Sequence, residues 1–168
     1  MIRQPAVFLD RDGVLNEEVG YISSPEQLKV FGYTKACIDR LHKAGFLSVV
    51  ISNQSGIARG YFTEKDLVMV NRKLVEETGV DKVYYCPHYL KGKIPYYSME
   101  CKCRKPGTGM IEKACRDLNI DLEKSFLVGD RASDIETGAK ARIKTILVRT
   151  GYGLEEEKTA CPDYICDD

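Results

Sequence analysis

Two acidic residues, Asp10 and Asp12, are separated by one residue and are followed by Gly13. A glycine allows a sharp turn, so both carboxyl groups can face the same side of the chain. Taken alone, this pattern fits an acid-rich turn as well as a functional site. A third acid, Asp130, follows Gly129 much later in the chain. Acids brought together repel each other unless a hard cation lies among them, and oxygen ligands of this kind suit Mg²⁺. The three acids therefore predict a magnesium site.

A second group of residues has the side chains that zinc prefers. Cys86 and His88 form one pair, Cys101 and Cys103 form another, and each pair has a spacing of two residues. Three thiolates and one imidazole match a tetrahedral Zn²⁺ with no open position, so we expect a structural zinc loop at about residues 86–103. The alternatives are unconnected thiols beside a surface histidine, or a redox pair. The spacing of Cys101 and Cys103 differs from the C-x-x-C redox motif.

The elements that must position these residues alternate between two patterns. Short runs rich in β-branched residues predict strands at 6–10, 46–52, 82–86, 125–130 and 144–149. Apolar residues spaced three or four apart predict helices at 35–44, 63–78, 108–118 and 133–141. Apolar strands separated by helices are typical of a three-layer α/β fold, in which helices cover both faces of a central parallel sheet. Residues 162–168 could begin a further strand.

Several residues suit the ends of these helices. Thr63 and Ser133 each precede acidic residues, as helix N-termini often do. Gly45 and Gly79 stand where helices should stop.

The polar residues follow the predicted strands. Residues 10–12 come after the first strand, residues 52–55 after the second, and Asp130 after the fourth. Parallel sheets bind ligands beyond the carboxyl ends of their strands, at the switch point of the topology. We therefore expect the three strand ends to meet at one crevice.

Composition narrows the classes of function. The 168 residues fit a single domain spanning 1–168. The 25 basic and 25 acidic residues give no net charge, so no overall field favours nucleic acid or a membrane surface. The longest apolar runs, such as FLSVVI, are too short to span a bilayer, and the N-terminus has no secretory signal pattern. Seven cysteines, an odd number, fit a reducing compartment better than a disulfide framework. We expect a cytoplasmic monomer with a small-molecule partner.

Four segments, in order, resemble the motifs of the haloacid dehalogenase (HAD) superfamily. They are FLDRDG at 8–13, SNQ at 52–54, KP at 105–106 and GDRASD at 129–134. The resemblance runs from about residue 7 to residue 151. It implies a Rossmann-like HAD fold and a magnesium-dependent phosphatase that forms an aspartyl phosphate.

The resemblance also implies roles for individual residues. Asp10 would be the nucleophile and a magnesium ligand. Asp12 would be the general acid and then the general base, with its backbone carbonyl on the metal. Asp130 would complete the magnesium site, and Ser52 and Lys105 would hold the phosphoryl oxygens. Asp134 is expected to support the site rather than to bind the metal directly.

The chain leaves little room for a large cap domain. Only about twenty residues separate Gly13 from the first predicted helix, and the insertion after the third strand is the zinc loop. Specificity must then come from loops. The expected substrate-binding residues are Glu18, Val19, Gly20, Tyr21, Asn53, Gln54, Ser55, Arg59, Arg104 and Arg131.

The longer runs DRDGVLN, SNQSGIARG and CKCRKPGTGM resemble the HAD branch that contains heptose-bisphosphate and histidinol phosphatases. This implies a sugar phosphate substrate, with a histidinol phosphatase or a non-catalytic phosphate-binding module as alternatives. Arg59 and Arg104 could bind a second phosphate, although a salt-bridged or solvated loop arginine would look the same. Arg131 stands where lysine is usual in this branch. The presence of both Asp10 and Asp12 argues against a module that only binds.

Overall fold

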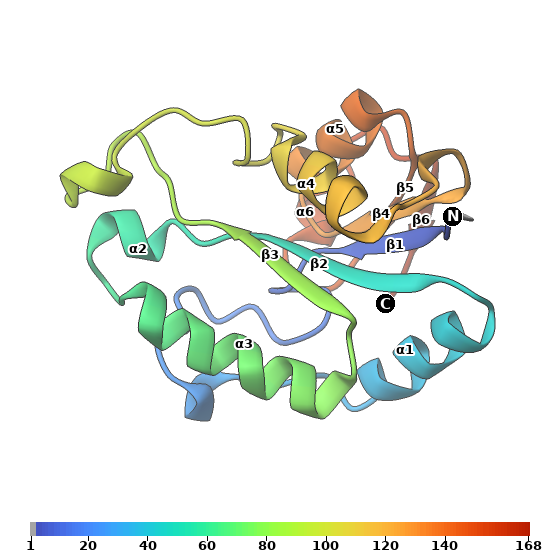
Figure 1. The fold of residues 1–168 in the computed structure, drawn as a ribbon, viewed down its shortest axis with the longest axis horizontal. Coiled ribbons are helices and arrows are strands. Elements are labelled where there is room, and N and C mark those ends of the chain that lie inside the picture. The colour runs from blue at the N-terminus through green and yellow to red at the C-terminus, as the bar shows by residue number, and fades with distance from the viewer. Residues whose placement is uncertain (1–2) are drawn as a thin grey trace.

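The computed structural model describes residues 3–168, and over this range six parallel strands form one sheet in the order β3-β2-β1-β4-β5-β6 (Figure 1). The strands are β1 (Ala6–Leu9), β2 (Leu47–Asn53), β3 (Lys82–Cys86), β4 (Phe126–Gly129), β5 (Lys144–Val148) and β6 (Tyr164–Cys166). This is the expected α/β architecture. The strand order changes direction at β1, which lies between β2 and β4.

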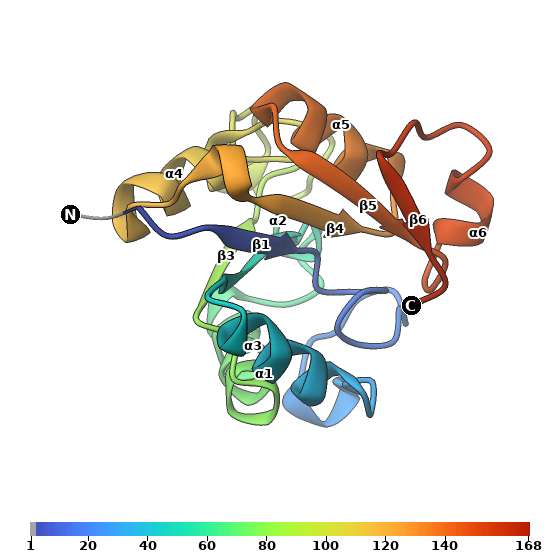
Figure 2. The ribbon, with the colours of Figure 1, turned by 90° about the vertical axis from the view of Figure 1, so that its right-hand side faces the viewer.

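Helices connect the strands and cover both faces of the sheet. The α-helices are α1 (Thr34–Lys43), α2 (Gly56–Arg59), α3 (Glu64–Thr78), α4 (Gly109–Leu118), α5 (Ala132–Ala141) and α6 (Gly153–Glu156). Short 3₁₀ turns lie at η1 (Pro25–Gln27), η2 (Pro95–Tyr97) and η3 (Leu122–Lys124). The views in Figures 1 and 2 agree in placing α1 and α3 on one face and α4 and α5 on the other.

The strands are apolar throughout because both of their faces are buried. In β1, Ala6 and Phe8 belong to the core beneath α4, whereas Val7 and Leu9 belong to the core beneath α1 and α3. This alternation follows from the period of two in a strand. Each β1 side chain therefore packs into one of two cores, which fixes the end of the strand, and Asp10 after it, in position.

Helix α3 begins and ends as its sequence predicts. The hydroxyl of Thr63 accepts a hydrogen bond from the backbone N–H of Asp66 at 3.3 Å, and the Asp66 carboxylate accepts one from the backbone N–H of Thr63 at 2.7 Å. This reciprocal pair is a capping box. At the other end Gly79 has φ of 77°, a left-handed conformation that favours glycine. Helix α5 starts at Ala132, one residue before the predicted start.

The sequence predicts five strands and a possible further one within residues 162–168, and the structure has six over the described residues. Strand β6 pairs with β5 within the segment that could begin a further strand, and its three residues are all exposed. A strand of this length carries too little alternation for its bounds to be predicted. For the same reason the sequence did not predict α2 and α6, which have four residues each. Within residues 3–168, no helix is long and apolar enough to cross a membrane.

Candidate active site

The carboxyl ends of β1, β2 and β4 lie side by side and border a cavity of about 400 Å³. Asp10 follows β1, Ser52 lies near the end of β2, and Asp130 follows β4. The expected convergence of three strand ends is therefore confirmed. The cavity is lined by Asp10, Asp12, Glu18, Gly20, Tyr21, Ser52, Asn53, Gln54, Ser55, Arg59, Arg104, Lys105, Arg131, Ser133 and Tyr152.

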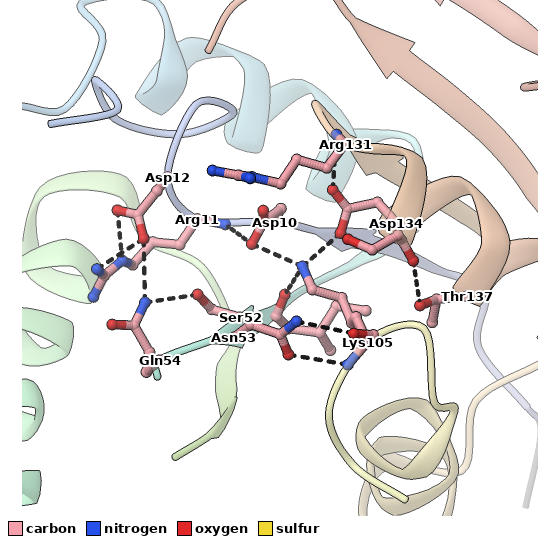
Figure 3. A network of polar contacts seen from close by, with 12 residues as sticks. Asp10, Arg11, Asp12, Ser52, Asn53, Gln54, Lys105, Arg131, Asp134 and Thr137 are labelled. Carbon is pink, nitrogen blue, oxygen red and sulfur yellow. Dashed lines mark hydrogen bonds and ion pairs between the residues drawn. The ribbon is translucent and has the colours of Figure 1, made fainter. Parts of the chain in front are cut away.

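Lys105 lies between two of the acids, and its side chain is buried. Its Nζ is 2.9 Å from an oxygen of Asp10 and 2.6 Å from an oxygen of Asp134, and it donates to the carbonyl of Ile51 at 2.9 Å (Figure 3). Burial alone would lower the pKa of Lys105, but the two carboxylates outweigh burial and raise it. The ammonium is therefore a permanent positive charge beside Asp10.

The backbone of Lys105 is fixed by one amide side chain. Asn53 accepts a hydrogen bond from the backbone N–H of Lys105 at 3.0 Å and donates one to its carbonyl at 3.1 Å. Because Asn53 is the last residue of β2, the sheet itself sets the place of Lys105.

Asp10, Asp130 and Asp134 form a compact group of buried acids. One oxygen from each lies within 4.8 Å of the others. Burial is the main cause that raises the pKa of Asp10 to about 8, and it also raises the pKa of Asp130 to about 7. Oδ2 of Asp130 accepts from the backbone N–H of Tyr152 at 2.9 Å, whereas its buried Oδ1 has no hydrogen-bond partner among the described residues.

These observations fit a hard cation. An unpartnered buried carboxylate oxygen is costly unless something positive binds it. Oxygen ligands with few protein donors suit Mg²⁺. The group includes Asp134, which the sequence assigned a supporting part, and it does not include the carboxylate of Asp12.

Asp12 is held by four donors. Arg11 contributes Nε at 3.1 Å and Nη2 at 3.0 Å, and Gln54 contributes Nε2 at 3.1 Å (Figure 3). Asn16 contributes Nδ2 at 2.9 Å. Arg11 is itself 1% exposed and donates to Asn71 of α3 at 3.2 Å. Sequence reasoning missed Arg11 and Asn71. Arg11 and Asn71 are 60 positions apart in the sequence, so their hydrogen bond can be found only in the folded chain.

The turn after Asp10 needs glycine. Gly13 has φ of 82°, and a side chain there would collide with the carboxylate of Asp130. Its carbonyl accepts from the hydroxyl of Thr150 at 2.5 Å. This close approach joins the turn after β1 to the segments after β4 and β5.

Ser52 faces the cavity from β2 and is almost fully buried. Its hydroxyl oxygen accepts from Nε2 of Gln54 at 2.8 Å. Gln54 thus donates to both Ser52 and Asp12, and it ties the end of β2 to the turn after β1.

Three arginines line the cavity. The guanidinium of Arg131 lies 3.8 Å from the ring centre of Tyr152, and its Nη2 is 3.7 Å from an oxygen of Glu18. Arg59 lies 4.1 Å from the ring centre of Tyr89, and Arg104 lies 5.3 Å from the same centre. Three positive side chains therefore lie against aromatic rings, a placement that suits guanidinium groups.

Most of the expected substrate-binding residues border the cavity. Val19 is 49% exposed and is not among the residues that line it. Ser133 and Tyr152 also line the cavity but were not predicted from the sequence as binding residues. Ser133 lies in the first turn of α5, after β4, and Tyr152 follows β5. The rule that ligands bind beyond strand ends, applied to β5 as well, would have found Tyr152.

The four predicted zinc ligands lie together. One atom from each of Cys86, His88, Cys101 and Cys103 lies within 4.8 Å of the others. The three sulfurs are 3.1 to 3.4 Å apart, and Nδ1 of His88 is 3.5 Å from the sulfur of Cys103. The backbone N–H of Arg104 donates to the sulfur of Cys101 at 3.3 Å. This set of donors could hold a tetrahedral zinc ion.

Comparison with known proteins adds independent information. A model of the HAD-hydrolase-like family matches residues 102–168. A D-glycero-alpha-D-manno-heptose-1,7-bisphosphate 7-phosphatase from Photorhabdus laumondii is 45% identical, with 89% of this chain and 85% of the relative covered. The beta-named counterpart from Haemophilus influenzae is 38% identical over 96% of this chain and 91% of the relative.

A solved structure is also similar. The D,D-heptose 1,7-bisphosphate phosphatase from B. bronchiseptica, complexed with magnesium and phosphate, superposes with a TM-score of 0.84 at 31% identity, covering 98% of this chain and 93% of that one.

Proposed function

This chain belongs to the HAD-like hydrolases, in the branch of the heptose-1,7-bisphosphate 7-phosphatases, and we propose that it removes the 7-phosphate of D-glycero-D-manno-heptose 1,7-bisphosphate. It is a phosphoric monoester hydrolase. The position of Asp10 supports this proposal most strongly, because its side chain faces the cavity and lies 2.9 Å from the ammonium of Lys105. A carboxylate so placed can attack phosphorus while a cation neutralises the phosphoryl oxygens.

In the first step an oxygen of Asp10 attacks phosphorus in line, and the bond between phosphorus and the sugar oxygen breaks. Asp12 gives its proton to that leaving oxygen. In the second step Asp12, now a carboxylate, takes a proton from the water that hydrolyses the aspartyl phosphate. The four donors from Arg11, Asn16 and Gln54 orient the carboxylate form of Asp12 that acts as the base in the second step.

Ser52 and Lys105 hold the phosphoryl oxygens. Both line the cavity, and Lys105 carries a charge that burial does not remove. In the transition state, negative charge accumulates on the equatorial phosphoryl oxygens. A fixed cation and a hydroxyl donor beside these oxygens stabilise that charge. Gln54 holds the Ser52 oxygen, which leaves the hydroxyl hydrogen free to donate.

We place magnesium among the carboxylates of Asp10 and Asp130 and the backbone carbonyl of Asp12. The unpartnered Oδ1 of Asp130 and the raised pKa values of Asp10 and Asp130 support this assignment. Bound there, the ion supplies positive charge that favours the ionised form of Asp10 and offsets the charge of the phosphoryl group. Asp134, whose oxygen pairs with Lys105, orients that lysine.

We assign structural zinc to Cys86, His88, Cys101 and Cys103. The supporting observation is their close approach, with no disulfide among them. The last of these cysteines immediately precedes Arg104 and Lys105. Zinc would therefore stabilise the backbone that presents both cations to the cavity.

The second phosphate of the substrate is assigned to Arg59 and Arg104. Both line the cavity, and a guanidinium can donate two parallel hydrogen bonds to phosphate oxygens. The names of the relatives differ in the anomer, alpha for one and beta for the other, so the preferred anomer is a matter for experiment. We place the enzyme in the cytoplasm, since seven cysteines without a disulfide suit a reducing compartment, and we propose that it acts as a monomer.

The decisive experiment measures phosphate release, with magnesium present, from both heptose 1,7-bisphosphate anomers and from histidinol phosphate. We expect one heptose anomer to have the highest kcat/KM. The Asp10→Asn variant serves as the control for contaminating phosphatase. Faster turnover of histidinol phosphate than of either anomer would reject the heptose substrate. A protein that releases no phosphate from any of them, and binds them equally well as Asp10→Asn, would be a binding module.

A further inference from the structure

Tyr89 contacts both arginines that we assign to the second phosphate. Its ring centre is 4.1 Å from the guanidinium carbon of Arg59 and 5.3 Å from that of Arg104. The two arginines come from different parts of the chain, one from the end of α2 and the other from the end of the cysteine loop (residues 86–103). A single half-buried aromatic ring therefore connects two separate cationic side chains.

The backbone around Tyr89 is firmly joined to α2. The carbonyl of Ala58 accepts hydrogen bonds from the N–H groups of Lys93 and Ile94, at 2.7 and 2.9 Å. The N–H of Tyr89 donates to the carbonyl of Tyr97 at 3.1 Å, which closes the loop on itself. Ala58 directly precedes Arg59, so these bonds hold the backbone of the loop that carries Tyr89 beside that arginine. Figure 1 shows this yellow-green loop beside α2.

The arginines have few other partners. Nε of Arg59 is buried and has no hydrogen-bond partner among the described residues. Arg104 donates Nη1 to the carbonyl of His88 at 3.2 Å. Two long cationic side chains at one cavity would repel each other and sample many rotamers, and ordering them has an entropic cost. A ring that attracts both guanidinium groups reduces that cost before a ligand arrives.

We propose that Tyr89 is a positioning residue that orders Arg59 and Arg104 into one site for the phosphate group distant from the reacting one. The inference rests on the proposed function and deepens it. Tyr89 does not touch the reacting atoms, so its contribution is to substrate binding and to the preference for bisphosphates. Both guanidinium groups lie over the ring, and the Tyr89 side chain also forms a hydrogen bond with Arg59, so the Tyr89→Phe variant separates the part of the ring from that of the hydroxyl.

The test compares Tyr89→Leu, Tyr89→Phe and the wild type on two substrates, the preferred heptose 1,7-bisphosphate and p-nitrophenyl phosphate, which has a single phosphate. For Tyr89→Leu we expect KM for the bisphosphate to rise on the order of tenfold, with kcat nearly unchanged. Its kcat/KM for p-nitrophenyl phosphate should stay within about twofold of the wild type. Tyr89→Phe keeps the ring and should restore the bisphosphate KM.

Tyr96→Leu is the matched control, since Tyr96 lies in the same loop and is 75% exposed. It should leave both substrates unaffected, and zinc content should be equal in all variants. If Tyr89→Leu kept the bisphosphate KM, or lost activity on both substrates together with zinc, the inference would be overturned while the proposed function stood. If the wild type itself did not prefer the bisphosphate, the proposed function would fail and the inference with it.

Discussion

The acid and lysine group at the strand ends and the cysteine loop are built in opposite ways. In the first, Asp134 and Lys105 are 0% and 4% exposed, and their charges compensate one another at 2.6 Å. The second extends beyond β3 with one short 3₁₀ turn (Figure 1). Side chains such as Leu90 are largely exposed there. The sheet and its two cores hold the first region in place. The second region has fewer core contacts. It is held by hydrogen bonds from Lys93 and Ile94 to the carbonyl of Ala58, by packing of Tyr97 against the cluster of Ile57, Phe62 and Leu67, and by the close approach of its four cysteine and histidine ligand atoms.

The two regions meet at Lys105. It lies two residues after Cys103, yet Asn53 of β2 fixes its backbone and Asp10 and Asp134 fix its side chain. Because the strand ends hold Lys105 even without the loop, we expect damage to the loop to weaken the reaction. Damage to the strand ends should abolish it. The following variants test that contrast.

The largest effect is expected from Asp10→Asn. An amide is not a competent nucleophile, so kcat should fall by at least about 10⁴-fold. Because the loop is independent of this side chain, zinc content should be unchanged. Measurement combines phosphate release with metal analysis of the same preparation. Activity within tenfold of the wild type would place the nucleophile elsewhere.

Lys105→Met should have the next largest effect. It leaves Asp10 and Asp134 buried without their cation, so kcat should fall by about 10²-fold to 10³-fold. In metal-free protein the free energy of unfolding should fall by about 3 kcal/mol, because breaking a buried ion pair leaves a charge uncompensated. Denaturant unfolding measures the second effect. Lys102→Met is the matched control, since Lys102 is exposed and should change neither quantity.

Cys101→Ser tests the loop and should have a smaller effect. Zinc content should fall below about half an ion per chain, because the site would lose one of four ligands. The expected loss of activity is about 10-fold to 100-fold, smaller than that of Lys105→Met because Asn53 still holds the Lys105 backbone. Cys161→Ser is the control, as Cys161 is exposed and lies outside the cluster. A loss as large as that of Asp10→Asn would show that the strand ends need the loop.

The smallest effect concerns pH and magnesium. Burial raises the pKa of Asp10 and Asp130 from 3.8 to about 8 and about 7. In metal-free protein their contribution to stability is fully present below pH 3.8 and is lost as the pH rises through 7 and 8. Magnesium competes with these protons, so it should raise Tm by about a few degrees more at pH 8 than at pH 6. Thermal unfolding with and without magnesium measures this. An equal gain at both pH values would place the ion elsewhere.

The sequence predicts the parts of the site that obey local rules. Asp10, Ser52 and Asp130 could be placed because parallel strands end at a common edge. The cluster of Cys86, His88, Cys101 and Cys103 could be predicted because ligand type and spacing limit a zinc site. The core helices were predicted within a residue or two because their apolar spacing is regular.

Other parts depend on contacts that no local pattern encodes. The pairing of Arg11 with Asn71 requires α3 to pack beside the turn after β1. The approach of Tyr89 to Arg59 requires the loop to fold back on α2. The bounds of strand β6 and its place at the edge of the sheet follow from pairing with β5. These features belong to tertiary structure and could be found only from the folded chain.

The charges at the strand ends also imply an order of events. Asp10 and Asp134 pair with the ammonium of Lys105, and Asp130 lies beside them, so these four groups carry an excess of two negative charges once the pH exceeds the raised pKa values of Asp10 and Asp130, about 8 and about 7. A phosphate dianion that enters while all three acids are ionised would be repelled. One magnesium ion carries enough positive charge to cancel the excess negative charge of the group. Above those pH values the cation should therefore enter before the sugar phosphate, and the enzyme should follow an ordered kinetic scheme in which substrate binds the metal-free form only weakly.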